Sequence, residues 1–403
     1  MLNNIRSAYI LRYVFENIKE IKSLKLAINN KSLQQKLYIS LVSYIRYHNQ
    51  TEIEIIPTDN IGDKEKNIFM NYSNEPKFYH IFFDDKKVDR NYINKNEKVS
   101  KIKIYIDMEI ESLEKIFEKI NCIKEIKFIK YNNPNIKIIK RMFLDCKNLS
   151  KLDISKLKTE NITNMAGMFC GCSNLKELNI SNFKTNNVTD MRIMFHGCSS
   201  LKELSVSNFN TENTLYMSYM FCECSLLKKL DLSNFKTKNV IAMDGMFGDC
   251  KSLEELDLSN FSTPVCRAMG LMFNGCFSIK KLKIKNFITD NVTNMGSLFC
   301  GCSSLKELDL SNFKTDNVDY MGWMFCGCSS LKSLDISHFN IDKVEDISWM
   351  FSGCSSLTNL SLFKFEKNKS IDMKYMFSKC NNKLKQKIKK SYKEIEEIAF
   401  DDD

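Results

Sequence analysis

Cysteine is the residue type in this sequence with the widest chemistry, because its thiolate acts as a nucleophile, a metal ligand or a disulfide partner. The chain of 403 residues contains sixteen cysteines. Ten of them recur every 26 residues: Cys146, Cys172, Cys198, Cys224, Cys250, Cys276, Cys302, Cys328, Cys354 and Cys380. One cysteine per repeat at a fixed place predicts a small buried side chain and a free thiol rather than a disulfide framework.

Four repeats carry a second cysteine two residues before the first. These are Cys170, Cys222, Cys300 and Cys326. Zinc sites usually have two to four residues between paired cysteines and further ligands nearby, so a C-x-C pair on one repeat fits poorly. His196, Gly248 and Asn274 also interrupt this second column. The sequence therefore predicts no metal site.

The remaining residues give little support to catalysis. The four histidines, His48, His80, His196 and His338, fall at unrelated places in the chain. The sequence contains no glycine-rich phosphate loop, no Ser-His-Asp arrangement and no H-E-x-x-H motif. We therefore expect neither an enzyme nor a bound cofactor.

The cysteines belong to a repeat whose period is constant. Each unit begins with a phenylalanine: Phe143, Phe169, Phe195, Phe221, Phe247, Phe273, Phe299, Phe325, Phe351 and Phe377. In one unit Leu331, Leu334 and Ile336 follow the L-x-x-L-x-L pattern of a short strand with alternating inward and outward side chains. Stacked units bring such strands together, so the pattern predicts an α/β repeat, a leucine-rich-repeat solenoid with a parallel β-sheet face.

The other half of each unit has a second apolar set with a different spacing. Phe313, Val318, Met321 and Met324 are spaced more like helical turns than like a strand, which predicts short helical or 3₁₀ backs. Asparagine recurs at Asn182, Asn208, Asn234, Asn260, Asn286 and Asn312, and threonine at Thr159, Thr185, Thr211, Thr237, Thr263, Thr289 and Thr315. We expect these rows to bond backbone groups of their own or the next coil.

The unit from Met168 to Met191 resembles the BspA-type leucine-rich-repeat family, whose repeat reads close to MFxGCSSLxxLDLSxFxTxxVTxM. The resemblance covers about residues 140–380. It implies a repeat fold, and it is shared with bacterial surface proteins that bind host or matrix proteins. Phenylalanine occupies the place where the usual leucine-rich repeat has Asn or Cys, at Phe183, Phe209, Phe235 and Phe313, which predicts a phenylalanine spine.

We divide the chain into four parts: a helical segment at 1–50, a small α+β lead-in and cap at 51–113, the repeats at 114–380, and a C-terminal capping helix with an acidic tail at 381–403. Residues 114–139 read as a degenerate first coil before about ten regular ones. The apolar spacing in the last part predicts a helix over 382–399.

Residues 5–48 resemble the start of an F-box, and an F-box docks a ubiquitin-ligase scaffold. The leading Leu-Pro of that family is missing, so a plain helical cap or partner-docking bundle stays open. The chain has no run of 18 apolar residues and no secretory signal, which predicts a cytoplasmic protein without a membrane span, with the cell surface as the alternative.

The net charge of +10 comes from interspersed basic and acidic residues, which favours a protein partner over nucleic acid. A binding face should lie where the repeat departs from its consensus. The column that varies most is Gly167, Ile193, Tyr219, Gly245, Leu271, Ser297, Trp323, Trp349 and Tyr375. Large amphipathic aromatics often anchor interfaces, so we predict Tyr219, Trp323, Trp349 and Tyr375 as partner-binding residues, with simple packing as the alternative.

The strand face offers a rival surface of mixed charge. Its columns are Glu177, Glu203, Lys229, Glu255, Lys281, Glu307 and Ser333, with Asp153, Asn179, Ser205, Asp231, Asp257, Lys283, Asp309 and Asp335 beside them. Three functions remain open at this stage: a non-catalytic protein-binding scaffold, a substrate-recognition adaptor of a ubiquitin ligase, and a surface-exposed adhesion protein.

Overall fold

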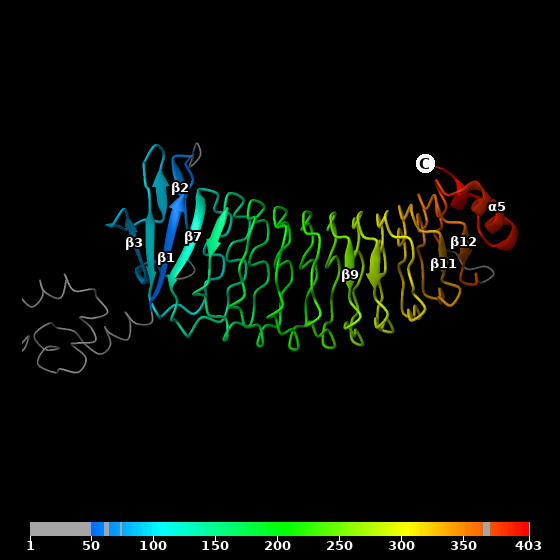
Figure 1. Ribbon diagram of the computed structural model, residues 1–403, viewed down its shortest axis with the longest axis horizontal. Coiled ribbons are helices and arrows are strands. Elements are labelled where there is room, and N and C mark those ends of the chain that lie inside the picture. Colours follow the sequence, from blue (N-terminus) through cyan, green and yellow to red (C-terminus); the bar gives the residue numbers. More distant parts are fainter. Residues whose placement is uncertain (1–49, 60–63, 73–74, 366–370, 403) are drawn as a thin grey trace, which may run out of the picture.

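The computed structural model describes residues 50–59, 64–72, 75–365 and 371–402. The segment resembling an F-box, residues 5–48, lies outside the described residues. The described chain is an elongated, gently curved array whose coils stack along its long axis (Figure 1). A small sheet stands at the N-terminal end of the array and helix α5 at the C-terminal end.

The N-terminal sheet has six strands in the order β4-β3-β6-β1-β7-β8. Their bounds are β1 (Thr51–Pro57), β3 (Tyr79–Phe83), β4 (Lys86–Val88), β6 (Ile102–Ile106), β7 (Ile123–Lys130) and β8 (Lys151–Asp153). Strand β1 pairs antiparallel with both β6 and β7, whereas β7 pairs parallel with β8 of the next coil. The antiparallel strands thus cover the open edge of the parallel coils, as a cap must.

The lead-in differs from the predicted α+β module. Its described residues also contain a second pair, β2 (Lys66–Ile68) with β5 (Tyr92–Asn94), and the short 3₁₀ helix η2 (Pro76–Phe78), but no α-helix. Side chains alternate between buried and half-buried along β1, β3 and β6, so one face of this sheet packs on the core.

The coils repeat every 26 residues through the whole array. Parallel bridges join equivalent residues of adjacent coils, from Ser112↔Ile138 to Asp346↔Asp372. The rings from Phe117 to Phe377 stack coil on coil, with centroids 5.5–5.8 Å apart. Phe117 and Phe143 stack in the same way as the later pairs, so the ring stack begins one coil before Phe143.

The leucine triplets line the interior as predicted. Leu331, Leu334 and Ile336 are all at most 4% exposed. The parallel sheet face is less continuous than predicted. Beyond the β7–β8 pair, the described coils pair only β9 (Glu255–Asp257) with β10 (Lys281–Lys283) and β11 (Ser333–Asp335) with β12 (Asn359–Ser361).

The described residues on the back of each coil form turns, and not the short helical or 3₁₀ segments that were predicted. Alternate backbone N–H groups, those of Met165, Gly167, Phe169 and Gly171, donate to carbonyls 25 residues later in the next coil. The N–H groups between them, those of Met168, Cys170 and Cys172, donate three residues back. Gly167 and Gly171 have φ of +61° and +73°, and such left-handed residues interrupt any helix.

The threonine and asparagine rows make the predicted bonds to neighbouring coils. The Thr237 hydroxyl donates to the carbonyl of Ser262 at 2.8 Å and accepts from its N–H at 2.9 Å. Asn234 Nδ2 donates to two carbonyls of the preceding coil, at 3.0 and 2.6 Å. His338 occupies the asparagine position of its coil, with Nε2 3.1 Å from the Leu310 carbonyl, so this histidine has a structural partner.

The regular cysteines are more than small apolar side chains. Each thiol of this column donates to the carbonyl of a phenylalanine 29 residues earlier, at 2.8–3.3 Å.

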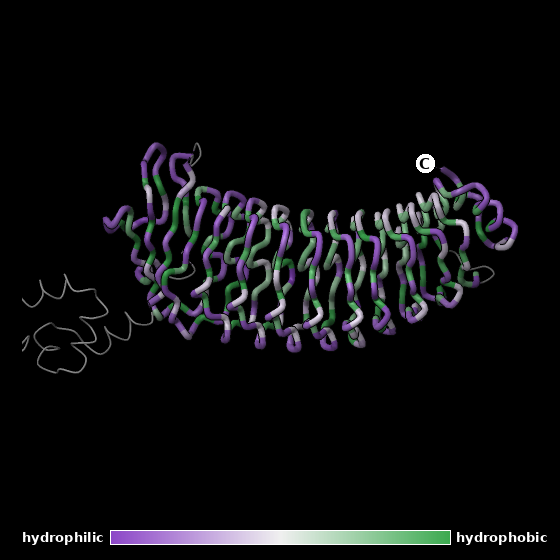
Figure 2. Tube along the Cα trace, viewed as in Figure 1, coloured by the Kyte–Doolittle hydropathy of each residue, from purple (hydrophilic) through white to green (hydrophobic). Residues whose placement is uncertain are grey.

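The predicted phenylalanine spine is present as a second stack from Phe209 to Phe313, with centroids 6.2–6.4 Å apart. Figure 2 shows hydrophilic residues gathered at the turns along the lower edge of the array.

The C-terminal cap has a shorter helix than the predicted 382–399. Helix α5 (Asn382–Ser391) begins after the N-cap Asn381 and ends where Tyr392 becomes extended. The chain continues into the 3₁₀ helix η3 (Glu397–Phe400), where Phe400 stacks on Phe377 with centroids 5.3 Å apart. One residue of the acidic tail, Asp402, accepts a hydrogen bond from Lys385 Nζ at 2.7 Å and is thereby held against helix α5.

Candidate functional site

The variable column predicted as a binding face occupies one backbone position on the back of nine successive coils. All nine residues from Gly167 to Tyr375 have φ between +50° and +62°. We call this set, one residue per coil, the left-handed column. A non-glycine residue in this conformation costs roughly 1–2 kcal/mol, and Gly167 and Gly245 show that glycine fits the position. Side chains at the other seven positions are therefore not required by the backbone.

Three of the four predicted anchors lie on consecutive coils and touch. The rings of Trp323 and Trp349 stack with centroids 4.7 Å apart and planes 10° apart. Tyr375 follows Trp349 at 4.7 Å and 38°. Trp323 is 37% exposed, and the other two rings are half-buried. We call Trp323, Trp349 and Tyr375 the aromatic strip.

Tyr219, the fourth predicted anchor, lies four coils earlier and outside the strip. Its ring covers Gly245 of the next coil, where a Cβ atom would come within 2.3 Å of Tyr219 Cε1. Tyr219 also lines a groove of about 680 Å³ with Arg141 and Arg192. Arg192 pairs with Asp190 at 2.7 Å and covers the ring of Tyr216, so its charge is already compensated.

The strand face, the alternative binding surface predicted from the sequence, carries ion pairs between adjacent coils. Lys281 pairs with Glu255 at 3.2 Å, and Lys283 with Asp257 at 2.7 Å. Bonds from Lys283 and Ser259 lower the pKa of Asp257 to about 2. Such exposed pairs stabilise a fold only weakly, and here opposite charges offset one another across the coils. This face therefore presents no stripe of one sign.

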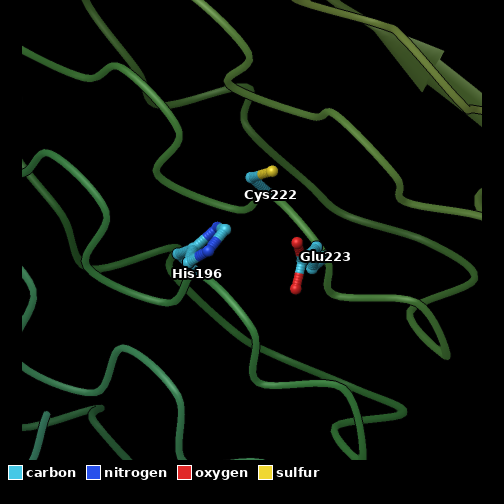
Figure 3. Close-up of side chains that lie close together, drawn as sticks. All are labelled: His196, Cys222 and Glu223. Carbon is cyan, nitrogen blue, oxygen red and sulfur yellow. The ribbon is translucent and has the colours of Figure 1, made fainter. Parts of the chain in front are cut away.

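Sequence reasoning missed a third group of side chains, which comes from two adjacent coils. His196, Cys222 and Glu223 each offer one ligand atom, and these atoms all lie within 4.8 Å of one another (Figure 3). Burial raises the pKa of the Cys222 thiol to about 12, and the nearby Glu223 and Asp249 carboxylates add to that shift. The sequence carried a signal for this group. His196 stands where neighbouring coils have cysteine, and in the next coil Glu223 stands where most coils have glycine.

All sixteen cysteines are free thiols, and all except Cys300 and Cys326 are buried. We expect a thiol-specific reagent to modify these two rapidly in the native protein and the remaining thiols only as the fold opens, because buried thiols are inert. Peptide mass mapping after brief exposure checks this. Equal modification of all sixteen, or fewer than sixteen thiols after denaturation, would contradict the assignment.

The solved structures that resemble this chain include repeat proteins of bacteria. One is a leucine-rich repeat protein from Bacteroides ovatus, 19% identical, covering 77% of this chain and 89% of that one with a TM-score of 0.34. Another is a leucine rich cell surface protein from Faecalibacterium prausnitzii, 18% identical, covering 62% and 76% with a TM-score of 0.31. A complex of TLR13 with ssRNA13 is 19% identical and covers 59% and 32%, with a TM-score of 0.28.

None of the curated proteins matches this chain. No helix among the described residues combines the length and apolarity needed to cross a membrane. One family model matches three overlapping segments, residues 111–205, 172–281 and 267–391, which together cover more than half of the chain and follow the stacked coils. The chain therefore belongs to the family described as "Mycoplasma protein of unknown function, DUF285".

Proposed function

We propose that this protein is a non-catalytic scaffold that binds another protein through the aromatic strip. One observation carries the proposal. Three large rings on consecutive coils stack at left-handed positions that also accept glycine elsewhere in the array. The coil does not need these rings to adopt its backbone conformation, so their presence favours a role at the surface.

The strip is suited to be an anchor because its backbone is held rigidly. The N–H groups of Trp323, Trp349 and Tyr375 donate to carbonyls of the following segment, at 2.9, 3.0 and 3.0 Å. Stacking further restricts the rings. A partner therefore meets a preorganised apolar surface and loses little additional entropy on docking. Tryptophan and tyrosine are also the residues most often found at interface hot spots.

The charges near the strip favour a protein over a nucleic acid. Three residues before each residue of the strip lies the one that forms the parallel bridge between coils: Tyr320, Asp346 and Asp372. Lys374, which directly precedes Tyr375 in the chain, pairs with Asp372 at 3.7 Å. A surface that stacks single-stranded bases also needs unpaired cations for the phosphates, whereas these carboxylates would repel them.

The test is affinity capture from native cells with the full chain and with a Trp323→Gly/Trp349→Gly variant. Glycine removes both rings and is favoured at φ of +62° and +57°, so the array should still fold. Each ring at a hot spot contributes about 2 kcal/mol or more, so we expect partners of the intact strip to bind the variant at least about 100-fold more weakly.

Leu271→Gly is the matched control, because Leu271 is exposed, has φ of +60° and lies outside the strip. It should retain all partners of the wild type. Retention of the same partners at the same affinity by the double-tryptophan variant would show that the strip is not the interface.

We further propose that the repeats are of the BspA type and that the protein acts in the cytoplasm. The sequence pattern supports the first proposal, and the free thiols are compatible with a reducing compartment. Protease treatment of intact cells distinguishes this location from surface display. Full protection is expected for a cytoplasmic chain, and digestion would support the adhesion alternative instead.

The ligase-adaptor alternative rests on residues 5–48, which the structure does not describe. A pull-down of the full chain with a ubiquitin-ligase scaffold protein tests it. Because the scaffold proposal uses only the repeats, we expect no binding. Capture that depends on residues 5–48 would make the adaptor the better account.

A further inference from the structure

We propose that His196, Cys222 and Glu223 form a binding site for a divalent transition-metal ion, and that zinc is the ion this donor set suits best. Imidazole nitrogen, thiolate sulfur and carboxylate oxygen are the three ligand types that zinc takes from proteins. Three protein ligands leave a fourth position of a tetrahedron for water or another ligand. The proposal is independent of the protein-binding role.

The repeat places the three donors together. His196 and Cys222 occupy the same position on adjacent coils, 26 residues apart, and Glu223 follows Cys222 directly. The Glu223 carboxylate bends back over the preceding coil, where a Cβ atom on Gly197 would lie 3.9 Å from its Oε2. The carboxylate therefore lies close to the backbone of the residue that follows His196.

The separations are close to those of a bound ion. The ligand atoms lie within 4.8 Å of one another. Zinc bonds of about 2.0–2.3 Å place the ligands of a tetrahedron roughly 3.3–3.8 Å apart, so closure needs movements of about 1 Å. Figure 3 shows His196 and Glu223 on opposite sides of the cluster with Cys222 above them. Side-chain rotation can supply this movement because Glu223 is exposed.

Among the described residues, no protein partner competes with a metal ion for the Glu223 carboxylate or for Nδ1 of His196. His196 Nδ1 is buried and makes no hydrogen bond. Within the described part of the chain, the Glu223 side chain has no ion pair or hydrogen bond assigned to it, whereas Glu212 and Glu254 pair with lysines of the next coil. Buried nitrogen atoms without a partner are rare in folded proteins, and a metal ion bound through Nδ1 would give this atom one.

The backbone beneath the cluster is fixed by the ladder on the back of the coils. The Gly197 N–H donates to the Cys222 carbonyl at 2.8 Å, and the Glu223 N–H donates to the Gly248 carbonyl at 2.7 Å. Metal sites need ligands carried on rigid segments, and both coils provide them.

Glu223 also departs from its column at a conformational cost. Most equivalent positions are glycines with φ of +69° to +74°: Gly171, Gly197, Gly275, Gly301, Gly327 and Gly353. Glu223 has φ of +59°, a conformation that disfavours a side chain. His196 likewise replaces the cysteine found at the same position in the coils before and after it. His196 and Glu223, which both depart from the repeat, therefore lie in the same cluster.

The test is a zinc titration of the full reduced chain after chelator treatment, read by competition with a chromogenic chelator, together with the thiolate-to-cobalt absorption of the cobalt form. We expect one zinc per chain at this site, and a melting temperature that rises with zinc. His196→Asn and Glu223→Gly should each weaken zinc binding by more than about 10–100-fold, the range that even outer-shell substitutions reach.

The two substitutions are chosen to keep the fold. Asparagine stands at the histidine position in Asn274, and glycine is the usual residue at position 223. Without zinc, Glu223→Gly should melt at or above the wild-type temperature, since it relieves a left-handed glutamate. The zinc-dependent rise should be lost. A residue with a purely structural role would not give this combination.

Cys300→Ser/Cys326→Ser is the control, because these two thiols are the only cysteines that are not buried and could bind zinc themselves. This variant should bind zinc at the cluster with wild-type affinity. The proposal is overturned if the wild type binds no zinc at micromolar concentrations, or if zinc binding survives in both His196→Asn and Glu223→Gly.

Discussion

Phe247→Ala is expected to lower the free energy of unfolding by about 3–5 kcal/mol, the range for removing a fully buried aromatic ring. Phe247 is 0% exposed and stacks between Phe221 and Phe273, with centroids 5.8 and 5.7 Å away. The ring lies near the middle of the array, where coils on both sides hold the cavity open. Urea unfolding followed by circular dichroism and by tryptophan fluorescence measures the loss.

In Phe247→Ala, the unfolding transitions followed by circular dichroism and by tryptophan fluorescence should also occur at different urea concentrations. Coils contact only their neighbours, so weakening one junction lets the two halves unfold independently. Both tryptophans, Trp323 and Trp349, lie on the C-terminal side of Phe247 and report that half alone. Phe247→Leu, which fills most of the cavity, should lose much less stability. A loss below about 1 kcal/mol for Phe247→Ala would contradict the stacked arrangement.

Thr237→Val is expected to cost about 2–3 kcal/mol, because two backbone groups lose their partner at roughly 1–3 kcal/mol each. Thr237 is 1% exposed, and its hydroxyl serves both the N–H and the carbonyl of Ser262 in the next coil. Valine has the same shape, so the effect isolates the hydroxyl from packing. Equilibrium urea unfolding provides the measurement.

Thr237→Ser keeps the hydroxyl and removes only a methyl group, so it should cost about 1 kcal/mol. If valine is tolerated as well as serine, the threonine row does not hold the coils together in the way described. A change confined to the protection of the Ser262 amide against hydrogen exchange would point to local rather than global stabilisation.

The period predicted most of the fold because one pattern repeats in every coil. The spacing of Leu331, Leu334 and Ile336 identified the interior rows, and the threonine and asparagine rows make the bonds expected of them. The back of the coil was predicted as short helical or 3₁₀ segments, and its described residues form turns. Its apolar spacing resembles helical turns, but two residues with positive φ in each coil interrupt the helix, and alternate N–H groups bond carbonyls of the next coil instead.

The candidate sites were predicted less completely, because they arise between coils. Variation within one column was enough to select Trp323, Trp349 and Tyr375, although the distance of Tyr219 from them follows only from counting coils. His196 and Glu223 were not connected, since 27 residues separate them in the chain. Residues 26 or 27 apart are neighbours in this array, and reading the sequence as a stack of coils would have brought them together.

The central claim is that the aromatic strip serves binding and is not needed for folding, and the unfolding free energy of Trp323→Gly/Trp349→Gly tests it most directly. Removing the rings forfeits stacking of about 0.5–1.5 kcal/mol per pair, whereas glycine relieves roughly 1–2 kcal/mol of left-handed strain at each position. We predict a variant within about 2 kcal/mol of the wild type. A loss of about 4 kcal/mol or more, as large as that expected for Phe247→Ala, would make the strip part of the core and contradict the claim.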